Sequence, residues 1–302
     1  MIIIANDITY TNMKVLIIQE NGHHDGNRGY RECFSFQRAF QEHADFSADI
    51  WGSRHANFQM TPDFSAYDII LQLEQYDGSY GQPWIPYDCI KKSKAYKILW
   101  AVDSHSRTPQ YYEYLRGLGG YQLVLNAIKH HVGPHGVWFP NAYDDMLIKP
   151  LRVDKKIDVA FCGNGGGEKR EAMVKHMQDN LGQSFKFDHW VIGDAMVEAI
   201  NSYRIHFNFN VLDDINYRSF ETIGCGTPLL TNNNYQYDEL GFVNGKNCLI
   251  YKTKEEAVDI AREYLGKSNK LKEIGDAGLE LAKKHSYRAR IRNLIKFVKT
   301  KI

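Results

Sequence analysis

The first half of the chain alternates between short apolar runs, typical of buried strands, and longer stretches in which apolar residues recur at helical spacing. The apolar runs predict strands at 14–19, 47–51, 67–73, 97–102 and 121–126, and the longer stretches predict helices near 30–43 and 109–116. Strands separated by helices form parallel βαβ units. We therefore predict an α/β fold with a doubly wound parallel sheet in this half.

A second series of strands and helices follows the segment from Pro140 to Pro150, which has no clear periodicity and is interpreted as a linker between domains. Strands are expected at 157–161, 185–188, 205–211, 229–230 and 248–251, and helices at 168–181, 194–203, 254–265, 268–284 and 287–300. The chain is long enough for two ordinary domains. The sequence therefore predicts two α/β domains in series.

The centre of the second series is a predicted strand, helix and strand within residues 203–231. Asn216 can cap the helix at its start, and Gly226 can end it. Arg218 and Glu221 then lie on one face of the first turn, where the partial positive charge of the helix N-terminus favours bound anions. An ordinary ion pair on the helix surface is the alternative interpretation.

The run from Glu221 to Pro228, Glu-Thr-Ile-Gly-Cys-Gly-Thr-Pro, resembles the nucleotide-sugar-binding signature of GT-B glycosyltransferases of the group 1 type. With Arg218 before it, the stretch is most similar to the spore-maturation CgeB-like branch. The resemblance implies two Rossmann-like doubly wound domains with a cleft between them, Glu221 on the ribose hydroxyls of the donor, and the helix N-terminus facing its diphosphate. Such enzymes often carry a second Glu eight positions earlier. Asp213 stands there in this chain, which leaves retention or inversion open.

A glycine-rich turn follows the strand expected at 157–161. Glycines at such a turn let backbone N–H groups approach a phosphate, and a nearby arginine can neutralise it. CgeB-like relatives show a similar strand, glycine-containing turn and arginine, so Gly163, Asn164 and Arg170 are expected to contact the donor. The turn lacks the Gly-Lys-Ser/Thr ending of a P-loop, which argues against an ATPase.

The loop that ends at Gly193 is a further candidate for donor binding. In GT-B enzymes the nucleotide base rests against this loop, so the resemblance implies a contact at Gly193. Trp190 in the same loop has an equally good interpretation as core packing.

Three loops after strands of the first half carry side chains suited to substrate binding or proton transfer, because ligands collect beyond the carboxyl ends of parallel strands. Loop 22–30 contains His24, and Asp103 and His105 follow another strand. Imidazole and carboxylate groups can accept a proton near neutral pH, so these three residues are candidate general bases without an order among them. Asp103 is also the acidic position of CgeB-like proteins. The loop 74–86 is either a wall or lid for the acceptor or an ordinary surface loop.

Neither a metal ion nor a cofactor is expected. His130, His131 and His135 are close in sequence but lack a carboxylate at a metal-ligand spacing. The five cysteines are also scattered without such spacing, which favours reduced structural thiols: Cys33, Cys89, Cys162, Cys225 and Cys248. The nucleotide sugar is expected to be a substrate and not a cofactor.

The composition, 43% apolar and 24% charged over 302 residues, is that of a globular protein. No apolar stretch approaches the roughly 20 residues that span a bilayer, and the N-terminus lacks a signal-peptide pattern, so a cytoplasmic location is expected. Residues 1–12 are interpreted as an upstream extension. Residues 283–302 contain eight Lys or Arg and no acid. Such a helix can touch an anionic membrane or nucleic acid, or present a solvated face.

The sequence thus predicts a glycosyltransferase that moves a sugar from a nucleotide diphosphate donor to an unidentified acceptor. By the resemblance, residues 13–140 form the acceptor-side domain, residues 151–285 bind the nucleotide sugar, and the helix at 286–302 crosses back to the first domain. Two alternatives stay open. One is a catalytically silent protein that binds a nucleotide or glycan as a regulator, and the other is an enzyme that transfers a sugar to a nucleic-acid base.

Overall fold

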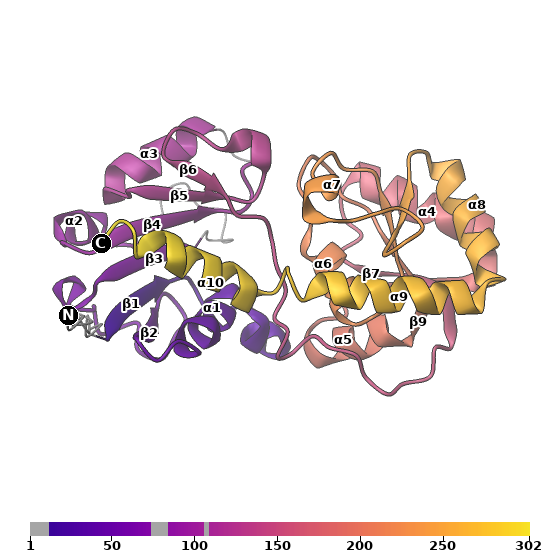
Figure 1. Cartoon of the computed structure of the whole chain (residues 1–302), viewed down its shortest axis with the longest axis horizontal. Coiled ribbons are helices and arrows are strands. Elements are labelled where there is room, and N and C mark those ends of the chain that lie inside the picture. Colours follow the sequence, from indigo (N-terminus) through magenta and orange to yellow (C-terminus); the bar gives the residue numbers. More distant parts are fainter. Residues whose placement is uncertain (1–11, 74–83, 106–108) are drawn as a thin grey trace, which may run out of the picture.

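The computed structural model describes residues 12–73, 84–105 and 109–302, and it contains two parallel β-sheets that define two Rossmann-like α/β domains (Figure 1). Residues 1–11 and most of the loop 74–86 lie outside the described residues. The two domains lie side by side along the long axis of the molecule. The predicted fold class is confirmed.

The first sheet has six strands in the order β2-β1-β3-β4-β5-β6, all parallel. Its strands are β1 (Met13–Ile18), β2 (Phe46–Trp51), β3 (Ile69–Leu73), β4 (Tyr96–Ala101), β5 (Leu123–Asn126) and β6 (Gly136–Trp138). Its helices are η1 (Asp25–Tyr30), α1 (Glu32–Gln41), η2 (Phe64–Ala66), α2 (Tyr87–Lys92), α3 (Pro109–Gly119) and η3 (Lys129–His131).

The strands of this sheet are unbroken apolar runs in the sequence because they are buried on both faces, as β1 shows. Val15 and Ile17 pack into the core on one face of the sheet, whereas Leu16 and Ile18 pack into the core on the other face. Successive side chains of a strand point to opposite faces, so a strand buried on both sides needs apolar residues at every position.

The second sheet has five strands in the order β11-β10-β9-β7-β8. Its strands are β7 (Ile157–Gly163), β8 (Phe185–His189), β9 (Tyr203–Asn208), β10 (Leu229–Asn232) and β11 (Leu249–Tyr251). Its helices are α4 (Glu168–Leu181), η4 (Gly182–Ser184), α5 (Gly193–Ser202), α6 (Tyr217–Gly224), α7 (Tyr237–Leu240), α8 (Lys254–Leu265) and α9 (Ser268–Ala282). All of its strand pairs are parallel, so their carboxyl ends meet at one edge.

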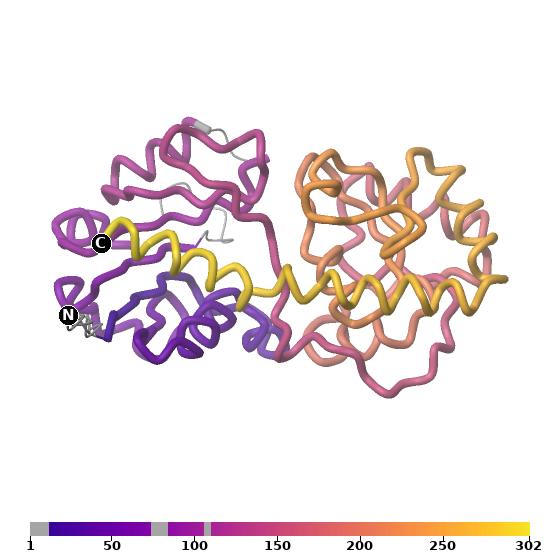
Figure 2. The backbone as a smooth tube through the Cα atoms, in the orientation of Figure 1, coloured from indigo at the N-terminus to yellow at the C-terminus, as the bar shows by residue number. Residues whose placement is uncertain are grey.

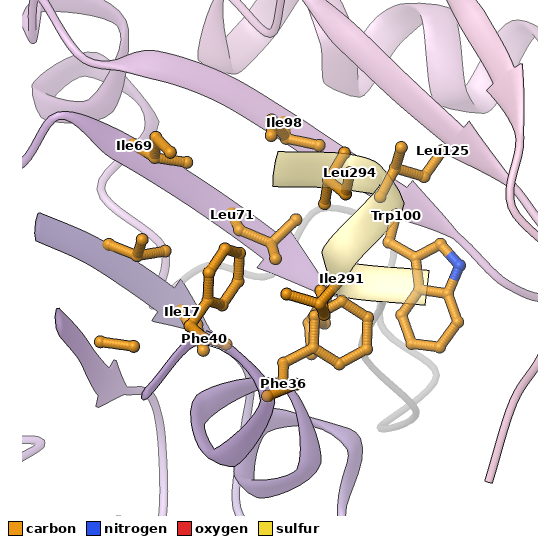
Figure 3. Close-up of a cluster of buried hydrophobic side chains, with 14 of the residues drawn as sticks. Ile17, Phe36, Phe40, Ile69, Leu71, Ile98, Trp100, Leu125, Ile291 and Leu294 are labelled. Atoms are coloured by element: carbon orange, nitrogen blue, oxygen red, sulfur yellow. The ribbon is translucent and has the colours of Figure 1, made fainter. Parts of the chain in front are cut away.

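The chain passes between the domains twice, once after β6 and once between α9 and α10 (Tyr287–Val298) (Figure 2). The two passages touch, because the backbone N–H of Tyr287 donates to the carbonyl of Tyr143 at 2.9 Å. After this point α10 returns over the first sheet. Ile291 and Leu294 pack there against Phe36 and other core residues (Figure 3).

Carboxylates bind two basic side chains at the ends of α10, one in its first turn and one just after its last residue. Arg288 forms ion pairs with Asp145 at 2.6 Å and Glu42 at 2.8 Å, and Lys299 pairs with Asp45. Part of the basic character of the last helix therefore holds it to its own domain. Contact of this helix with an anionic membrane or nucleic acid stays a prediction. Among the described helices, none is long and apolar enough to cross a membrane.

Two expected boundaries in the second half are wrong. Tyr203, expected at the end of a helix, begins β9, and β9 stops at Asn208 instead of continuing to Val211. Beyond the strand, Asn210 is buried, and its backbone N–H donates to Asn232 Oδ1 at 2.8 Å. The Asn232 side chain thus replaces the backbone hydrogen bond that would have extended β9. The sequence pattern does not predict the short elements β6, α2, α7, η1, η2, η3 and η4.

Candidate active site at the domain cleft

The glycine turn after β7 and the first turn of α6 meet at the carboxyl edge of the second sheet. Arg218 Nε donates to the carbonyl oxygen of Cys162, the residue before Gly163, at 2.8 Å. A Cβ atom at Gly163 would lie 3.9 Å from the same Nε. The structure therefore brings together the two elements that the sequence proposed for diphosphate binding.

Arg218 and Glu221 form an ion pair through Nη1 and Oε2, with side chains only 21% and 13% exposed. Burial by itself lowers the pKa of Arg218, but the neighbouring groups, with the Glu221 carboxylate first among them, together raise the pKa. Arg218 therefore keeps its charge in a partly dehydrated place, where a charge acts more strongly than on the surface. The interpretation as an ordinary surface ion pair does not fit this burial.

Arg170 brings a second guanidinium group to the same turn. Its Nη1 donates to the carbonyl of Asn164 at 3.1 Å, and the Asn164 side chain accepts from the backbone N–H of Gly166 at 2.9 Å. Burial lowers the pKa of Arg170, Asp214 opposes this effect, and the charge of Arg218 adds to it. Two cations and the backbone of the turn thus face one place, which is an arrangement suited to a phosphate.

A buried network of asparagines fixes the start of α6. Asn216 caps the helix by accepting from the backbone N–H of Ser219, as predicted, and its amide donates to Asn208 Oδ1 at 3.0 Å. Asn208 also donates to Ser219 Oγ at 3.1 Å, and Asn210 Nδ2 donates to the Tyr237 hydroxyl at 2.9 Å. Sequence reasoning missed the roles of Asn208 and Asn210. Their signal was the presence of amides at the end of an otherwise apolar strand.

A cavity of about 260 Å³ lies between the domains and contains both Arg218 and Glu221 in its wall. The first domain contributes Tyr30, Arg31 and Glu32 from the end of η1 and the start of α1. The expected cleft between the two domains is therefore present, and its walls carry charged groups from both.

Tyr287, the first residue of α10, also lines this cavity. Burial raises the pKa of Tyr287, and the carboxylates of Glu32 and Glu221 raise it further. The same phenol therefore lies near one carboxylate from each domain. Its proximity to Tyr217 on α6 joins the returning helix to the donor-side helix, and no sequence pattern had indicated this contact.

Gly193 forms a close contact between the domains. Its backbone is left-handed, with φ of 62°, and a Cβ atom there would lie 2.1 Å from the carbonyl oxygen of Gly26 in the first domain. Only glycine fits such a position. The structure thus shows a packing role for Gly193, and contact with a nucleotide base stays a prediction.

Trp190, in the same loop, is 53% exposed and adopts a left-handed backbone with φ of 55°. The interpretation of Trp190 as core packing is therefore wrong. Its ring lies 5.7 Å from that of His24, measured between centroids, so the structure places this candidate base against the second domain.

The other two candidate bases, Asp103 and His105, follow β4 in the first domain, where Ser104 Oγ lies 2.8 Å from His131 Nδ1. Which of the three accepts a proton stays open.

Among the histidines after β5, His130 contacts the second domain. His130 contacts the Tyr235 hydroxyl, and its Nε2 lies 3.7 Å from Asp213 Oδ2. Asp213 is the position at which the relatives often carry Glu. In the part of the chain that the structure describes, no group of His, Cys, Asp and Glu is arranged to hold a metal ion.

A family described as glycosyl transferase-like matches residues 145–296. This match spans half of the chain and includes the glycine turn, Arg170, Arg218 and Glu221. The chain therefore belongs to the glycosyl transferase-like family and is a glycosyltransferase. The CgeB-like branch within such enzymes stays a prediction.

Solved structures resemble this chain over nearly its whole length. Sucrose-phosphate synthase from Thermosynechococcus elongatus has a TM-score of 0.66 at 10% identity, covering 95% of this chain and 98% of that one. HepE from Anabaena, solved with UDP-glucose, has a TM-score of 0.65 at 11% identity, with 95% and 100% covered. A glycosyltransferase from Rickettsia africae has a TM-score of 0.67 at 10% identity, with 96% and 98% covered. These likenesses show the GT-B fold. No curated protein sequence matches.

Proposed function

We propose that the protein transfers a sugar from a nucleoside diphosphate sugar, bound mainly by residues 151–285, to an acceptor bound mainly by residues 13–140. The observation that carries this proposal is the meeting of Arg218 and Arg170 at the glycine turn, with Arg218 and its partner Glu221 in the wall of the cleft. The solved complexes of HepE with UDP-glucose and with UDP make uridine nucleotides the first donors to test.

The departing diphosphate needs positive charge in the transition state. Arg218, Arg170 and the N-terminus of α6 supply it from fixed positions, and groups that are already oriented cost little reorganisation during the reaction. The acceptor oxygen forms a bond to the anomeric carbon, and the bond from that carbon to the phosphate oxygen breaks with its electron pair. A base among Asp103, His105 and His24, or solvent, takes the acceptor proton. This route needs no metal ion.

Glu221 is assigned to the ribose of the donor. Its carboxylate accepts hydrogen bonds, and its pairing with Arg218 places it one helical turn from the proposed diphosphate position. The exposed ring of Trp190, beside His24, is a suitable surface for the base, because aromatic faces stack on nucleobases.

A panel of nucleotide sugars tests the proposal, with UDP, GDP, ADP, CDP and dTDP sugars incubated separately with the protein. We expect one nucleotide to raise the melting temperature most, and its sugar to release that nucleoside diphosphate. We call it the cognate diphosphate. An Arg218→Ala control should release it at least about tenfold more slowly, because a charged hydrogen bond is worth about 1.5–3 kcal/mol. Stabilisation without release would instead indicate a silent binding protein, and no stabilisation by any nucleotide would contradict the proposal.

A further inference from the structure

His206 lies in the middle of β9 and is completely buried. Its ring stands where the ladder between β7 and β9 ends, since the last paired residues are Ala160 and His206. The backbone N–H of Cys162 donates to His206 Nε2 at 3.2 Å, so the ring replaces the next strand-to-strand bond. The ring therefore fixes the end of β7, immediately before the Gly163 turn.

The hydrogen bonds of His206 determine which nitrogen carries the proton. Because Nε2 accepts from Cys162, the proton of the neutral ring is on Nδ1, which donates to Thr222 Oγ1 at 2.6 Å. The Thr222 hydroxyl in turn donates to the backbone carbonyl of Arg218. Burial and the nearby charge of Arg218 lower the pKa of His206 to about 3, so the ring stays neutral at physiological pH.

These bonds form a closed ring, because Arg218 Nε donates back to the carbonyl of Cys162 at 2.8 Å. Both the backbone and the guanidinium group of Arg218 are thus tied to Cys162, one through Thr222 and His206 and the other directly. A shift of the imidazole would move the strand end, the first turn of α6 and the guanidinium group together.

We propose that His206 is a positioning residue for sugar transfer, which acts through Thr222 to hold the Arg218 guanidinium beside the Gly163 turn. This inference rests on the proposed function, in which Arg218 stabilises the departing diphosphate. A misplacement of about 1 Å by a remote group can cost roughly a hundredfold in rate. His206 therefore contributes to turnover without touching the substrate.

The decisive variant is Thr222→Val, which removes the connecting hydroxyl while nearly keeping the shape of the side chain. We expect it to lower kcat for release of the cognate diphosphate about tenfold, with KM for the donor changed less than about twofold. Thr227→Val is the matched control, because Thr227 lies beyond the other end of α6, is also buried, and donates its hydroxyl at 2.8 Å to the carbonyl of Ile200 in α5. The control should keep the kcat of the wild type.

Substitutions of His206 test the two nitrogen atoms of its imidazole separately. An Asn amide nitrogen can replace Nδ1 as donor to Thr222, whereas a Gln side chain reaches the position of Nε2 and accepts from Cys162. His206→Asn should therefore keep a higher kcat than His206→Gln. If neither variant folds, as judged by circular dichroism, Thr222→Val carries the test.

A double-mutant cycle with Arg218→Ala distinguishes positioning from general stability. If the ring of hydrogen bonds acts through Arg218, Thr222→Val should lower kcat less than about twofold in the Arg218→Ala background. A tenfold loss in both backgrounds, or an unchanged kcat in folded Thr222→Val, would overturn the inference while leaving the proposed function intact. A wild-type protein that neither binds nor turns over any donor of the panel would overturn both.

Discussion

The hydroxyl of Tyr30 in the first domain donates to Asp194 Oδ1 in the second, with the two oxygens 2.6 Å apart. This bond lies next to the close approach of Gly193 to Gly26. On another side of the cleft, His130 contacts Tyr235. Hydrogen bonds therefore join the two domains at more than one place outside the two connecting segments.

Replacing Tyr30 by Phe should loosen this junction while leaving each sheet intact. Burial and the Asp194 carboxylate raise the pKa of Tyr30, so the phenol keeps its proton and the bond persists across neutral pH. We expect faster amide exchange in residues 25–30 and 193–202, because a hydrogen bond of this kind contributes about 1 kcal/mol.

Tyr67→Phe is the matched control, since the Tyr67 hydroxyl donates to Asp49 within the first domain at 3.1 Å. It should leave exchange in both of those segments unchanged. Equal exchange in wild type and Tyr30→Phe would show that the bond does not hold the domains together.

The Glu221→Gln variant should weaken binding of the cognate diphosphate about tenfold, because a hydrogen bond to a charged acceptor is worth about 1.5–3 kcal/mol and an amide keeps only part of it. Isothermal titration would measure the loss. The same variant should bind the 2′,3′-dideoxy analogue as well as the wild type does, because that analogue lacks the ribose hydroxyls. An equal loss for both ligands would remove Glu221 from the ribose site.

Arg218→Ala and Arg170→Ala should each weaken binding of the cognate diphosphate at least about tenfold, but they should leave binding of the corresponding nucleoside unchanged. The reason is that both guanidinium groups face the proposed diphosphate position and not the base. Arg262→Ala is the control, because Arg262 donates at 2.7 Å to the carbonyl of Asn180 on the surface of the same domain. Equal losses for diphosphate and nucleoside would indicate a structural role for these arginines.

The stability of the fold should decrease as the pH falls below about 6.5, with His285 as one cause. Burial and the charge of Arg290 lower the pKa of His285 to about 4, and its Nε2 donates to Leu240 while Nδ1 accepts from Arg290. The unfolded chain binds a proton below about pH 6.5, whereas the folded chain does so only near pH 4. The contribution of neutral His285 to the free energy of unfolding is thus complete above pH 6.5. It falls by about 1.4 kcal/mol for each pH unit between pH 6.5 and pH 4.

Urea unfolding at pH 7.5, 6 and 5 would measure this contribution. His285→Gln should be less sensitive to pH than the wild type over this range, because the titrating group is gone. The same slope in both proteins would mean that His285 is not kept neutral by the fold.

Much of the fold was predictable because parallel strands buried on both faces leave unbroken apolar runs, as Val15 to Ile18 do in β1. The three-residue strand β6 (Gly136–Trp138) lacks such a signal, because all of its residues are only partly buried. At the end of β9, apolar spacing suggested continued pairing through Val211, but buried amide groups end the strand. The spacing of apolar residues indicates which side chains are buried, but it does not show which groups the backbone hydrogen-bonds to.

The parts of the donor site that the sequence identified lie at strand ends and near the starts of helices, where local geometry is regular. Gly163 and Arg218 could be placed together because Gly163 ends β7 and Arg218 follows the neighbouring parallel strand β9. Tyr287 reaches the cavity only because α10 returns to the first domain, and Glu32 reaches it only because the domains meet there. His206 has no local signal, since a histidine in a strand shows neither its burial nor its partners.

A crystal structure of the protein with its cognate diphosphate would show whether the Gly163 turn and the two arginines bind the donor. We expect the diphosphate to lie at the Gly163 turn, within hydrogen-bond distance of Arg218 or Arg170, and Glu221 to contact the ribose hydroxyls. A nucleotide bound away from this cleft, or one whose diphosphate touches neither arginine, would contradict this expectation.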